Sequence, residues 1–395
     1  MILLPPTTKY VVVTKEGDPL CRPARARLIW AANTAEATSL LGVPSLLAGG
    51  IDAFTFRIES AAGKFAAYRA LETLYGVRSS FDVALLHHDA KASTWTAEGD
   101  FRRYVMPGAA VVHTRDPRIA LSCVKRNTPY ILEHHDEDYQ NNFENWSDLK
   151  LSSPLCLAVV AITEEIGIRL ARQGVPEQKI IILDSGVNAT AALRRTAAAT
   201  RWRQSLLKLP YKQLVVYTGG LQAERGIHDI MTAAAELTST LFVLSGGHKS
   251  DIAECKRVMM ARGLSNIRLF GYQNHEVVCE LQQAADVLIF SRAAEGRGDI
   301  TSPLKMFEYL LSGTPIVAAD IPATTRWAKH DIAVQFYQPA KPASIAAALK
   351  KIANSFPFKQ GGYEENIRAG HPYVWQERQR RLLEFVGHVP VKLTY

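Results

Sequence analysis

Short apolar runs alternate with helix-like segments along this chain, and the alternation starts twice. The runs are rich in β-branched residues, and helical patterns such as residues 227–237 separate them. We interpret the following runs as strands: residues 10–14, 82–87, 110–114 and 130–133, then 213–218, 241–245, 267–270, 286–290 and 315–319. Strands that alternate with helices are typical of βαβ units, which build parallel sheets covered by helices. The sequence therefore predicts an α/β fold with two doubly wound parallel sheets.

Two sheets in 395 residues predict two domains. Residues 188–200 are rich in Ala and Thr and lack a strong apolar period, which favours a connector. A last helical pattern, residues 374–386, carries apolar side chains among charges. We predict domains at 1–188 and 189–373, and a closing helix and tail at 374–395 that return toward the first domain. Ligands of such sheets bind beyond the carboxyl ends of strands, so we expect the two domains to face one another across a cleft with a site at its floor.

The composition is that of an ordinary soluble protein, with 47% hydrophobic and 21% charged residues. The longest apolar stretch, residues 155–162, is well short of the roughly 20 residues that a membrane-spanning helix needs. Residues 1–8 lack the cationic lead of an export signal. The five cysteines are scattered, which favours reduced thiols over a disulfide framework. We therefore predict a cytoplasmic protein, associated at most peripherally with the inner face of the membrane.

The net charge of +8 is concentrated in the second half of the chain. Residues 1–190 hold 20 Lys and Arg against 21 Asp and Glu, whereas residues 191–395 hold 26 against 17. This asymmetry indicates an anionic ligand in the second half, with solvated surface lysines as the alternative. No basic stripe interleaved with aromatic residues is present, so we expect no nucleic-acid partner.

Two glycines, Gly219 and Gly220, follow the predicted strand at 213–218. They permit a tight turn and a close approach of the backbone to a ligand. Arg225 comes just before a helix expected to begin near residue 226, where the helix end already bears partial positive charge. A phosphate bound between them resolves this conflict. The alternative is an arginine that points into solvent or pairs with Glu224.

A second predicted helix also has a cation near its amino end, where the helix dipole is positive. Ser302 is a good N-cap, Pro303 suits the first helical position, and Gly313 is a plausible stop. Lys305, at the third helical position, is again a cation at a positive helix end. Two such helix starts indicate one shared diphosphate. Glu308, three residues further on, has the chemistry to accept hydrogen bonds from a ribose diol, and an intrahelical pair with Lys305 is the alternative.

These residues resemble the donor-binding domain of retaining GT-B glycosyltransferases of family GT4. In that family a G-x-L-x-x-[KR]-G type loop follows the first strand, as in residues 219–226, and a glutamate-containing helix ends in x-G-x-P-[IV]-[VI]-A, as in residues 308–318. The resemblance covers roughly residues 110–387. It implies two Rossmann-like domains, the first on the acceptor side and the second binding the nucleotide-sugar donor. It extends the set of donor-binding candidates to Gly219, Gly220, Arg225, Tyr272, Ser302, Pro303, Leu304, Lys305 and Glu308.

The sequence departs from the family at two points. Gly220 stands where the family often has an arginine, which leaves Arg225 as the only cation of the loop. Ile300 stands eight positions before Glu308, where the family has the first of two glutamates. An E-G-x-G element occurs at residues 295–298, which places Glu295 13 positions before Glu308, as though about five residues had been inserted.

The catalytic candidates are Glu295, His135 and Asp136. Either Glu295 still reaches the sugar hydroxyls, or backbone amides near Thr301 and Ser302 replace it. His135 and Asp136 follow the predicted strand at 130–133 and resemble the His-Asp that ends a first-domain strand in the family. The resemblance implies that His135 hydrogen-bonds the donor sugar or orients the acceptor. Without the resemblance, a structural histidine is the alternative.

The sequence therefore predicts a retaining glycosyltransferase that moves a sugar from a UDP- or GDP-linked donor to an acceptor hydroxyl in bacterial surface polysaccharide, lipid-linked glycan or glycolipid assembly. We expect no cofactor beyond the donor, and no metal site, because the histidines lack zinc-ligand spacing. Two alternatives remain open: a nucleotide-sugar epimerase of the same fold, and a catalytically inactive binding partner of a true transferase. The sequence leaves the donor, the acceptor and the oligomeric state unassigned.

Overall fold

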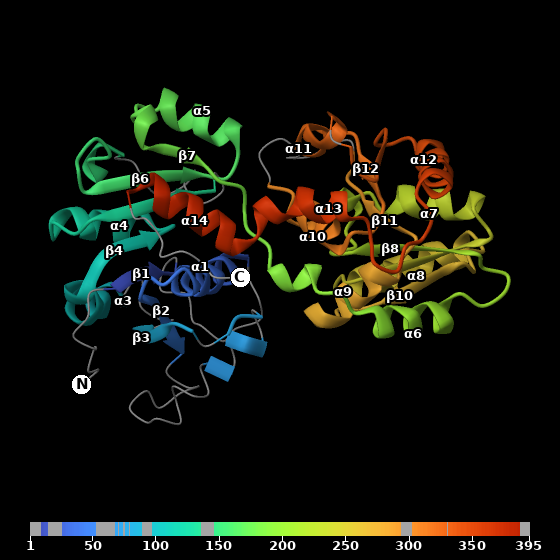
Figure 1. Ribbon diagram of the computed structural model, residues 1–395, viewed down its shortest axis with the longest axis horizontal. Helices are drawn as coiled ribbons and strands as arrows, with labels where there is room; N and C mark the ends of the chain where they lie inside the picture. The colour runs from blue at the N-terminus through green and yellow to red at the C-terminus, as the bar shows by residue number, and fades with distance from the viewer. Residues whose placement is uncertain are drawn as a thin grey trace. The chain divides into compact units, whose positions relative to one another are not determined.

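The computed structural model describes residues 9–14, 26–52, 68–69, 71–73, 76–78, 80–88, 97–135, 146–293, 302–329 and 331–387. The chain divides into two compact units (Figure 1). Unit 1 consists of Met1–Gly186 together with Trp375–Tyr395, and unit 2 is Val187–Val374. No helix among the described residues combines the length and apolar character that crossing a membrane requires.

Unit 1 contains a sheet of seven described strands in the order β3-β2-β1-β4-β5-β6-β7. Every described pairing in this sheet is parallel. Its central strands β1 and β5 are buried along their whole length and are mostly apolar, because helices cover both of their faces. The strands are β1 Lys9–Val13, β2 Ser45–Asp52, β3 Asp82–His88, β4 Ala109–Thr114, β5 Tyr130–His134, β6 Cys156–Ala161 and β7 Ile180–Ile182.

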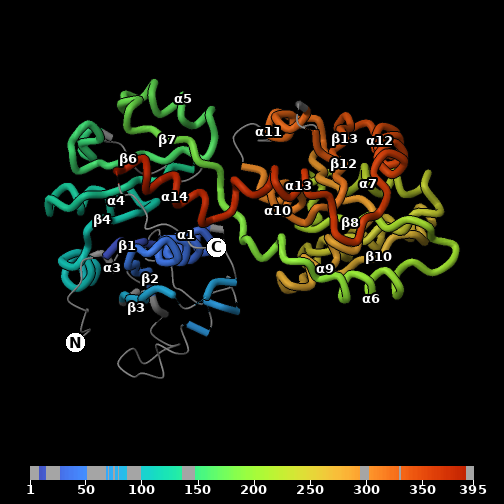
Figure 2. The backbone as a smooth tube through the Cα atoms, viewed as in Figure 1, coloured from blue at the N-terminus to red at the C-terminus, as the bar shows by residue number. Residues whose placement is uncertain are grey.

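Two sets of helices enclose this sheet. The core on one face includes side chains of α1 and α14, and the core on the other face includes side chains of α4 and α5. Figure 2 traces α14, in red, back to the strands drawn in blue and green. A side chain at Gly186 would collide with Trp375, so α14 packs closely where the first part of unit 1 ends. The helices are α1 Ala26–Leu40, α3 Ala97–Asp100, α4 Pro117–Lys125, α5 Glu164–Arg172 and α14 Trp375–Phe385, with a π-helix at Phe101–Val105.

Unit 2 contains a sheet of six described strands in the order β10-β9-β8-β11-β12-β13, again with parallel pairings. The strands are β8 Gln213–Thr218, β9 Thr240–Ser245, β10 Ile267–Phe270, β11 Val287–Phe290, β12 Ile316–Ala319 and β13 Val334–Tyr337. The helices are α6 Thr196–Leu206, α7 Ile227–Glu236, α8 Lys249–Ala261, α9 His275–Ala284, α10 Leu304–Ser312, α11 Pro322–Thr325, α12 Pro342–Ser355 and α13 Glu364–Gly370.

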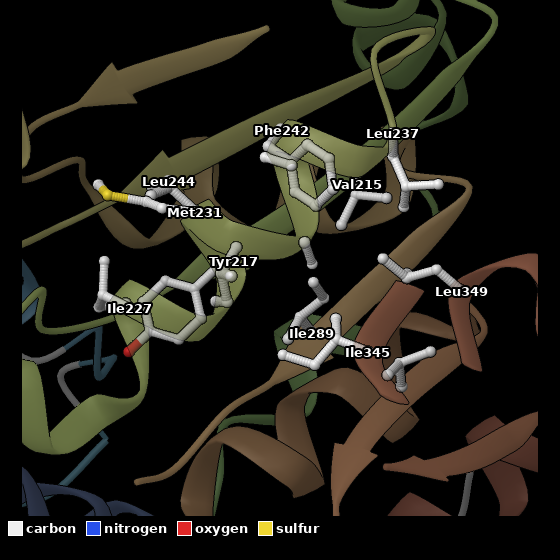
Figure 3. Packing of buried hydrophobic residues seen from close by; sticks show 14 of the residues in the cluster. Val215, Tyr217, Ile227, Met231, Leu237, Phe242, Leu244, Ile289, Ile345 and Leu349 are labelled. Atoms are coloured by element: carbon white, nitrogen blue, oxygen red, sulfur yellow. The ribbon is translucent and has the colours of Figure 1, made fainter. Parts of the chain in front are cut away.

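Each face of this sheet also packs into its own hydrophobic core. One joins alternate strand residues to α7, α8 and α12, and the other joins the remaining strand residues to α6, α9 and α10. Figure 3 shows Val215 and Tyr217 of β8 in one cluster with Ile227 of α7 and Ile345 of α12. Consecutive strand residues thus point to opposite faces, as the period of a strand requires.

The strand order reverses at one place in each sheet. In unit 2 the reversal lies between β8 and β11, and in unit 1 between β1 and β4. Loops that leave two such strands diverge to opposite faces, which opens a crevice at their carboxyl ends. In unit 2 these are the loops that follow Thr218 and Phe290.

Each predicted strand is present to within one residue at either end, which confirms the two α/β sheets. The predicted helix at 374–386 is present as α14. The connector predicted at 188–200 is wrong in its second part, because α6 already begins at Thr196. The segment that begins α6, Thr-Ala-Ala-Ala-Thr, lacks an apolar period but is rich in alanine, the strongest helix former.

Candidate functional site

Glycines shape the loop after β8 and fit it to the loop after β9. Gly219 donates its N–H to the carbonyl of Ser245 at 2.8 Å, and Tyr217 Oη donates to the carbonyl of Gly220 at 2.7 Å. Gly219 and Gly246 have positive φ angles, 138° and 121°, and a side chain on Gly246 would collide with the backbone of Gly219. The close approach of the two loops therefore requires glycine at both positions.

Lys305 reaches back from α10 to this loop. Its Nζ lies 3.9 Å from the centre of the Tyr217 ring, a cation–π distance. A Cβ added to Gly219 would lie 2.6 Å from the same Nζ, so Gly219 also makes room for the lysine. Burial lowers the pKa of Lys305 to about 7; the charges of Arg225 and Arg292 lower it further, and Glu308 opposes them. Lys305 is thus a cation held where its surroundings disfavour positive charge.

The start of α10 differs from its prediction. The helix begins at Leu304, so Pro303 rather than Ser302 occupies the N-cap position, and no side chain caps this end. The N–H of Leu304 donates to the carbonyl of Ser302 at 3.0 Å, which tightens the entry to the helix. Lys305 is therefore the second helical residue, still within the turn that bears the positive end of the dipole. The predicted stop at Gly313 is confirmed, with a φ of 68°.

The loops after β8 and β11 are tied together around Arg225. Arg225 ends a short 3₁₀ turn, Ala223–Arg225, and Gly226 then takes a left-handed conformation, with a φ of 73°, before α7 begins. Ser291 Oγ donates to the carbonyl of Arg225 at 2.6 Å. A Cβ on Gly226 would lie 3.0 Å from the carbonyl carbon of Arg292. These contacts bring Arg225 and Arg292 to one place at the strand-order reversal.

Arg292 is a site residue that the sequence reasoning missed. Burial lowers its pKa, and Arg225 lowers it further, while Tyr217 and Glu224 oppose the shift. Its position in the sequence could have indicated it, because Arg292 stands two residues after β11 and ligands of such sheets bind beyond the carboxyl ends of strands. Arg225 and Arg292 both lower the pKa of Lys305, and Arg225 lowers that of Arg292, so these three residues are called the cation cluster from here on.

Glu308 lies one turn after Lys305 on α10 and is half-buried. Burial raises its pKa, whereas His275, Lys305 and a hydrogen bond from Gln282 lower it. Lys305 Nζ packs over Tyr217, and no ion pair joins Lys305 to Glu308 among the described residues. The site therefore keeps Glu308 near Lys305 without an ion pair between the two side chains.

The remaining donor-side candidate is Tyr272, which follows β10. Its side chain is 81% exposed, so any contribution of this residue to a buried ligand comes from its backbone. Of the catalytic candidates, Asp136 and Glu295 lie outside the described residues, as does Thr301. The groups of three or more His, Cys, Asp or Glu that would hold a metal ion do not occur in the described part of the chain.

His135, in unit 1, follows β5 directly. Its Nε2 lies 2.7 Å from Oε1 of Glu133, and its side chain is 13% exposed. Burial lowers the pKa of His135 to about 4; Arg115 lowers it further, and Glu133 opposes the shift. The imidazole is therefore neutral near pH 7. Glu133, the partner that fixes the ring, was not recognised from the sequence, although an acidic residue within an apolar strand is an unusual signal.

The central part of unit 2 has a recognisable sequence. Residues 212–355 match the family model described as "Glycosyl transferases group 1". This segment is a glycosyl transferases group 1 domain. It spans β8 to the end of α12 and contains the whole cation cluster together with Glu308. The group 1 domain is therefore the part of the chain in which three cations meet at the strand-order reversal.

Relatives of the chain are distant in sequence. An uncharacterized glycosyltransferase of Methanocaldococcus jannaschii is 19% identical over 57% of this chain and 55% of its own length. A processive diacylglycerol alpha-glucosyltransferase of Acholeplasma laidlawii is 21% identical over 52% and 64%. The chain thus spans less than two thirds of the length of these relatives.

A solved structure matches most of the chain. The crystal structure of HepE from Anabaena, in complex with UDP and glucose, is similar with a TM-score of 0.66 and 15% identity, over 95% of this chain and 98% of that one. At this identity the likeness shows the fold alone, which is GT-B, and so confirms the predicted fold class.

Proposed function

We propose that this protein is a retaining glycosyltransferase that moves a sugar from a nucleoside diphosphate sugar to an acceptor hydroxyl. The observation that supports this most is the cation cluster, because three mutually repelling cations stand at the strand-order reversal of a glycosyl transferases group 1 domain. A diphosphate relieves their repulsion on binding. Retention of the anomeric configuration is what the resemblance to family GT4 implies.

The cation cluster has a role in the chemical step. When the sugar leaves, negative charge develops on the β-phosphate of the nucleoside diphosphate. Lys305, Arg225, Arg292 and the amino end of α10 would stabilise that charge more strongly in the transition state than in the ground state. These protein groups supply positive charge of the kind a divalent cation supplies elsewhere, so we propose that the reaction is independent of metal ions.

The other candidates keep the roles given by the family resemblance. Glu308 accepts hydrogen bonds from the ribose, Tyr272 faces the base through its backbone, and His135 hydrogen-bonds the sugar or the acceptor. The HepE structure holds UDP and glucose, which favours a UDP-linked donor here. The alpha-glucosyltransferase relative is named for a diacylglycerol acceptor, which favours a lipid or lipid-linked acceptor over a free sugar.

The test is to incubate the purified protein with UDP- and GDP-sugars, with and without diacylglycerol in mixed micelles, and to measure nucleoside diphosphate release. We expect release from a UDP-sugar that persists in excess EDTA, and a glycolipid product whose anomeric proton coupling matches that of the donor. Isomerised donor without release supports an epimerase instead. Binding of the donor with no turnover under any condition supports an inactive partner and overturns the proposal.

A further inference from the structure

Unit 1 buries a carboxylate within its sheet. Glu133 lies in β5, between β4 and β6, and has no exposed surface. A carboxylate in such a place destabilises the fold unless charged and polar partners surround it. Three partners do so. Arg378 Nη2 lies 2.8 Å from Oε1, His135 Nε2 lies 2.7 Å from the same oxygen, and His113 Nε2 lies 3.2 Å from Oε2.

Arg378 comes from α14, almost 250 residues after Glu133 in the chain. Its side chain is 2% exposed, and its Nε donates to the carbonyl of Asp184 at 2.7 Å. The guanidinium is therefore fixed by two contacts of different kinds. Burial alone raises the pKa of Glu133, but Arg378, His113 and His135 together hold it well below its ordinary value. Glu133 and Arg378 thus form a charge-balanced buried pair.

The surroundings of the two histidines in contact with this pair disfavour the charged imidazole. Burial lowers the pKa values of both His113 and His135, the latter to about 4. A neutral imidazole whose Nε2 faces a carboxylate carries its proton on Nε2, because two acceptors do not hydrogen-bond one another. Its Nδ1 then bears a lone pair. His113 fits this assignment, since Tyr10 Oη lies 2.8 Å from its Nδ1 and has a proton to donate.

We propose that Glu133 and Arg378 are positioning residues, which fix His135 in the Nε2–H tautomer and so present its Nδ1 as a hydrogen-bond acceptor for a hydroxyl of the sugar or the acceptor. The inference rests on the proposed function for the identity of that hydroxyl. The geometry has a direct chemical consequence. The other tautomer would turn Nδ1 into a donor, which orients a hydroxyl group the opposite way.

The first test uses the wild-type protein and needs no activity. Long-range proton–nitrogen correlation spectra of protein labelled with ¹⁵N in its histidine rings distinguish the two tautomers and the charged form, and His135→Gln assigns the signal. We expect His135 as the neutral Nε2–H tautomer from pH 8 to pH 5, because the charged groups that face it are Arg115, Arg378 and Glu133, and burial together with the two arginines outweighs Glu133. A proton on Nδ1, or a charged ring at pH 7, overturns the proposal.

The second test measures function. Glu133→Gln combined with Arg378→Met removes both charges at similar volume, so the fold does not have to bury an unpaired charge. We expect turnover at saturating donor to fall roughly tenfold, nucleoside diphosphate affinity to change less than about threefold, and the His135 spectrum to show a mixture of tautomers. Glu165→Gln, an exposed carboxylate on α5, is the matched control and leaves all three unchanged.

The outcomes separate the two proposals. A folded double variant with normal turnover and an unchanged tautomer overturns the positioning role while leaving the transferase intact. A wild-type protein that turns over no nucleotide sugar overturns the proposed function, and the spectra of His135 still decide whether Glu133 fixes its ring.

Discussion

Each unit of this protein gathers charged side chains at one place, but the two clusters are balanced differently. Around Glu133 in unit 1, one carboxylate meets one guanidinium and two histidines, so the positive and negative charges of the buried pair offset one another. In the cation cluster of unit 2, Lys305, Arg225 and Arg292 repel one another, and the nearby Glu308 only partly offsets them.

The difference indicates which cluster belongs to the fold and which awaits a ligand. A charge-balanced buried network needs no ligand to offset its charges, and it favours one fixed orientation for its members. An unbalanced cluster raises the free energy of the folded state until an anion binds, and such groups are typical of functional sites. We therefore expect the Glu133 network to govern the stability and geometry of unit 1. The cation cluster should instead govern the affinity for an anionic ligand.

The largest expected effect comes from unbalancing the Glu133 network. Arg378→Met leaves a buried carboxylate without its cation, so the free energy of unfolding should fall by about 3–5 kcal/mol. Urea denaturation followed by circular dichroism measures it. Arg169→Met, on the exposed face of α5, should change it by less than about 0.5 kcal/mol. If Arg378→Met is as stable as Arg169→Met, the network does not stabilise unit 1.

Substitutions in the cation cluster should change the affinity for the nucleoside diphosphate rather than the stability of the fold. Arg225→Ala, Arg292→Ala and Lys305→Ala should each weaken nucleoside diphosphate binding by roughly 1.5–3 kcal/mol, or about tenfold to a hundredfold, because each removes a charge-assisted contact. Calorimetric titration of the diphosphate and of the free nucleoside measures this. Lys256→Ala, an exposed cation on α8, is the control and should bind normally. Unchanged affinity in all three folded variants would remove the diphosphate from this cluster.

His135→Ala sharpens the contrast between the units. We expect turnover to fall roughly tenfold, equivalent to about 1.4 kcal/mol, with less than about a threefold change in diphosphate affinity, since the cations that hold the phosphates lie in unit 2. Glu308→Ala should do the reverse and weaken nucleotide binding through a lost ribose contact. Turnover measured at saturating donor and affinity measured by direct nucleotide titration distinguish these two effects. Normal turnover in His135→Ala would move the role to His134.

The smallest expected effect is on pH dependence. The pKa of Lys305 is about 7 in the free protein, so its charge is lost as the pH rises through 7. Because the charged form binds the anion, affinity for the diphosphate should fall roughly fivefold between pH 7 and pH 8. Lys305→Met should lack this fall. The ionisation of the diphosphate itself is common to both proteins, so a parallel pH profile would contradict the assigned pKa.

Sequence patterns predicted those strands and helix ends whose physical cause lies in a few neighbouring residues. Short runs of strand-forming residues predicted β8 and β10 to the residue, and Gly313 marked the end of α10 because its backbone needs a left-handed conformation. The strand β2 was missed because its Ala-Gly-Gly segment lacks the usual β-formers, although its neighbours bury it on both sides.

Contacts between distant segments were beyond the reach of those patterns. Arg225 and Lys305 were expected to share a ligand because both stand at helix starts, whereas Arg292 became visible only when the sheet brought β11 beside β8. The pairing of Glu133 with Arg378 joins a strand to the far end of the chain, and no local spacing indicates it. The roles proposed for His135 and Glu308 still await experiment.

The return of α14 to unit 1 sets an order of events during synthesis. Trp375, Leu382 and Leu383 belong to a core whose other members are all translated before Val187. At ribosomal rates of roughly 5–20 residues per second, the first part of unit 1 waits about 10–40 s for them. Until then Glu133 also lacks Arg378, so unit 2 has its complete sequence while one face of the unit 1 sheet is still without the side chains that close its core.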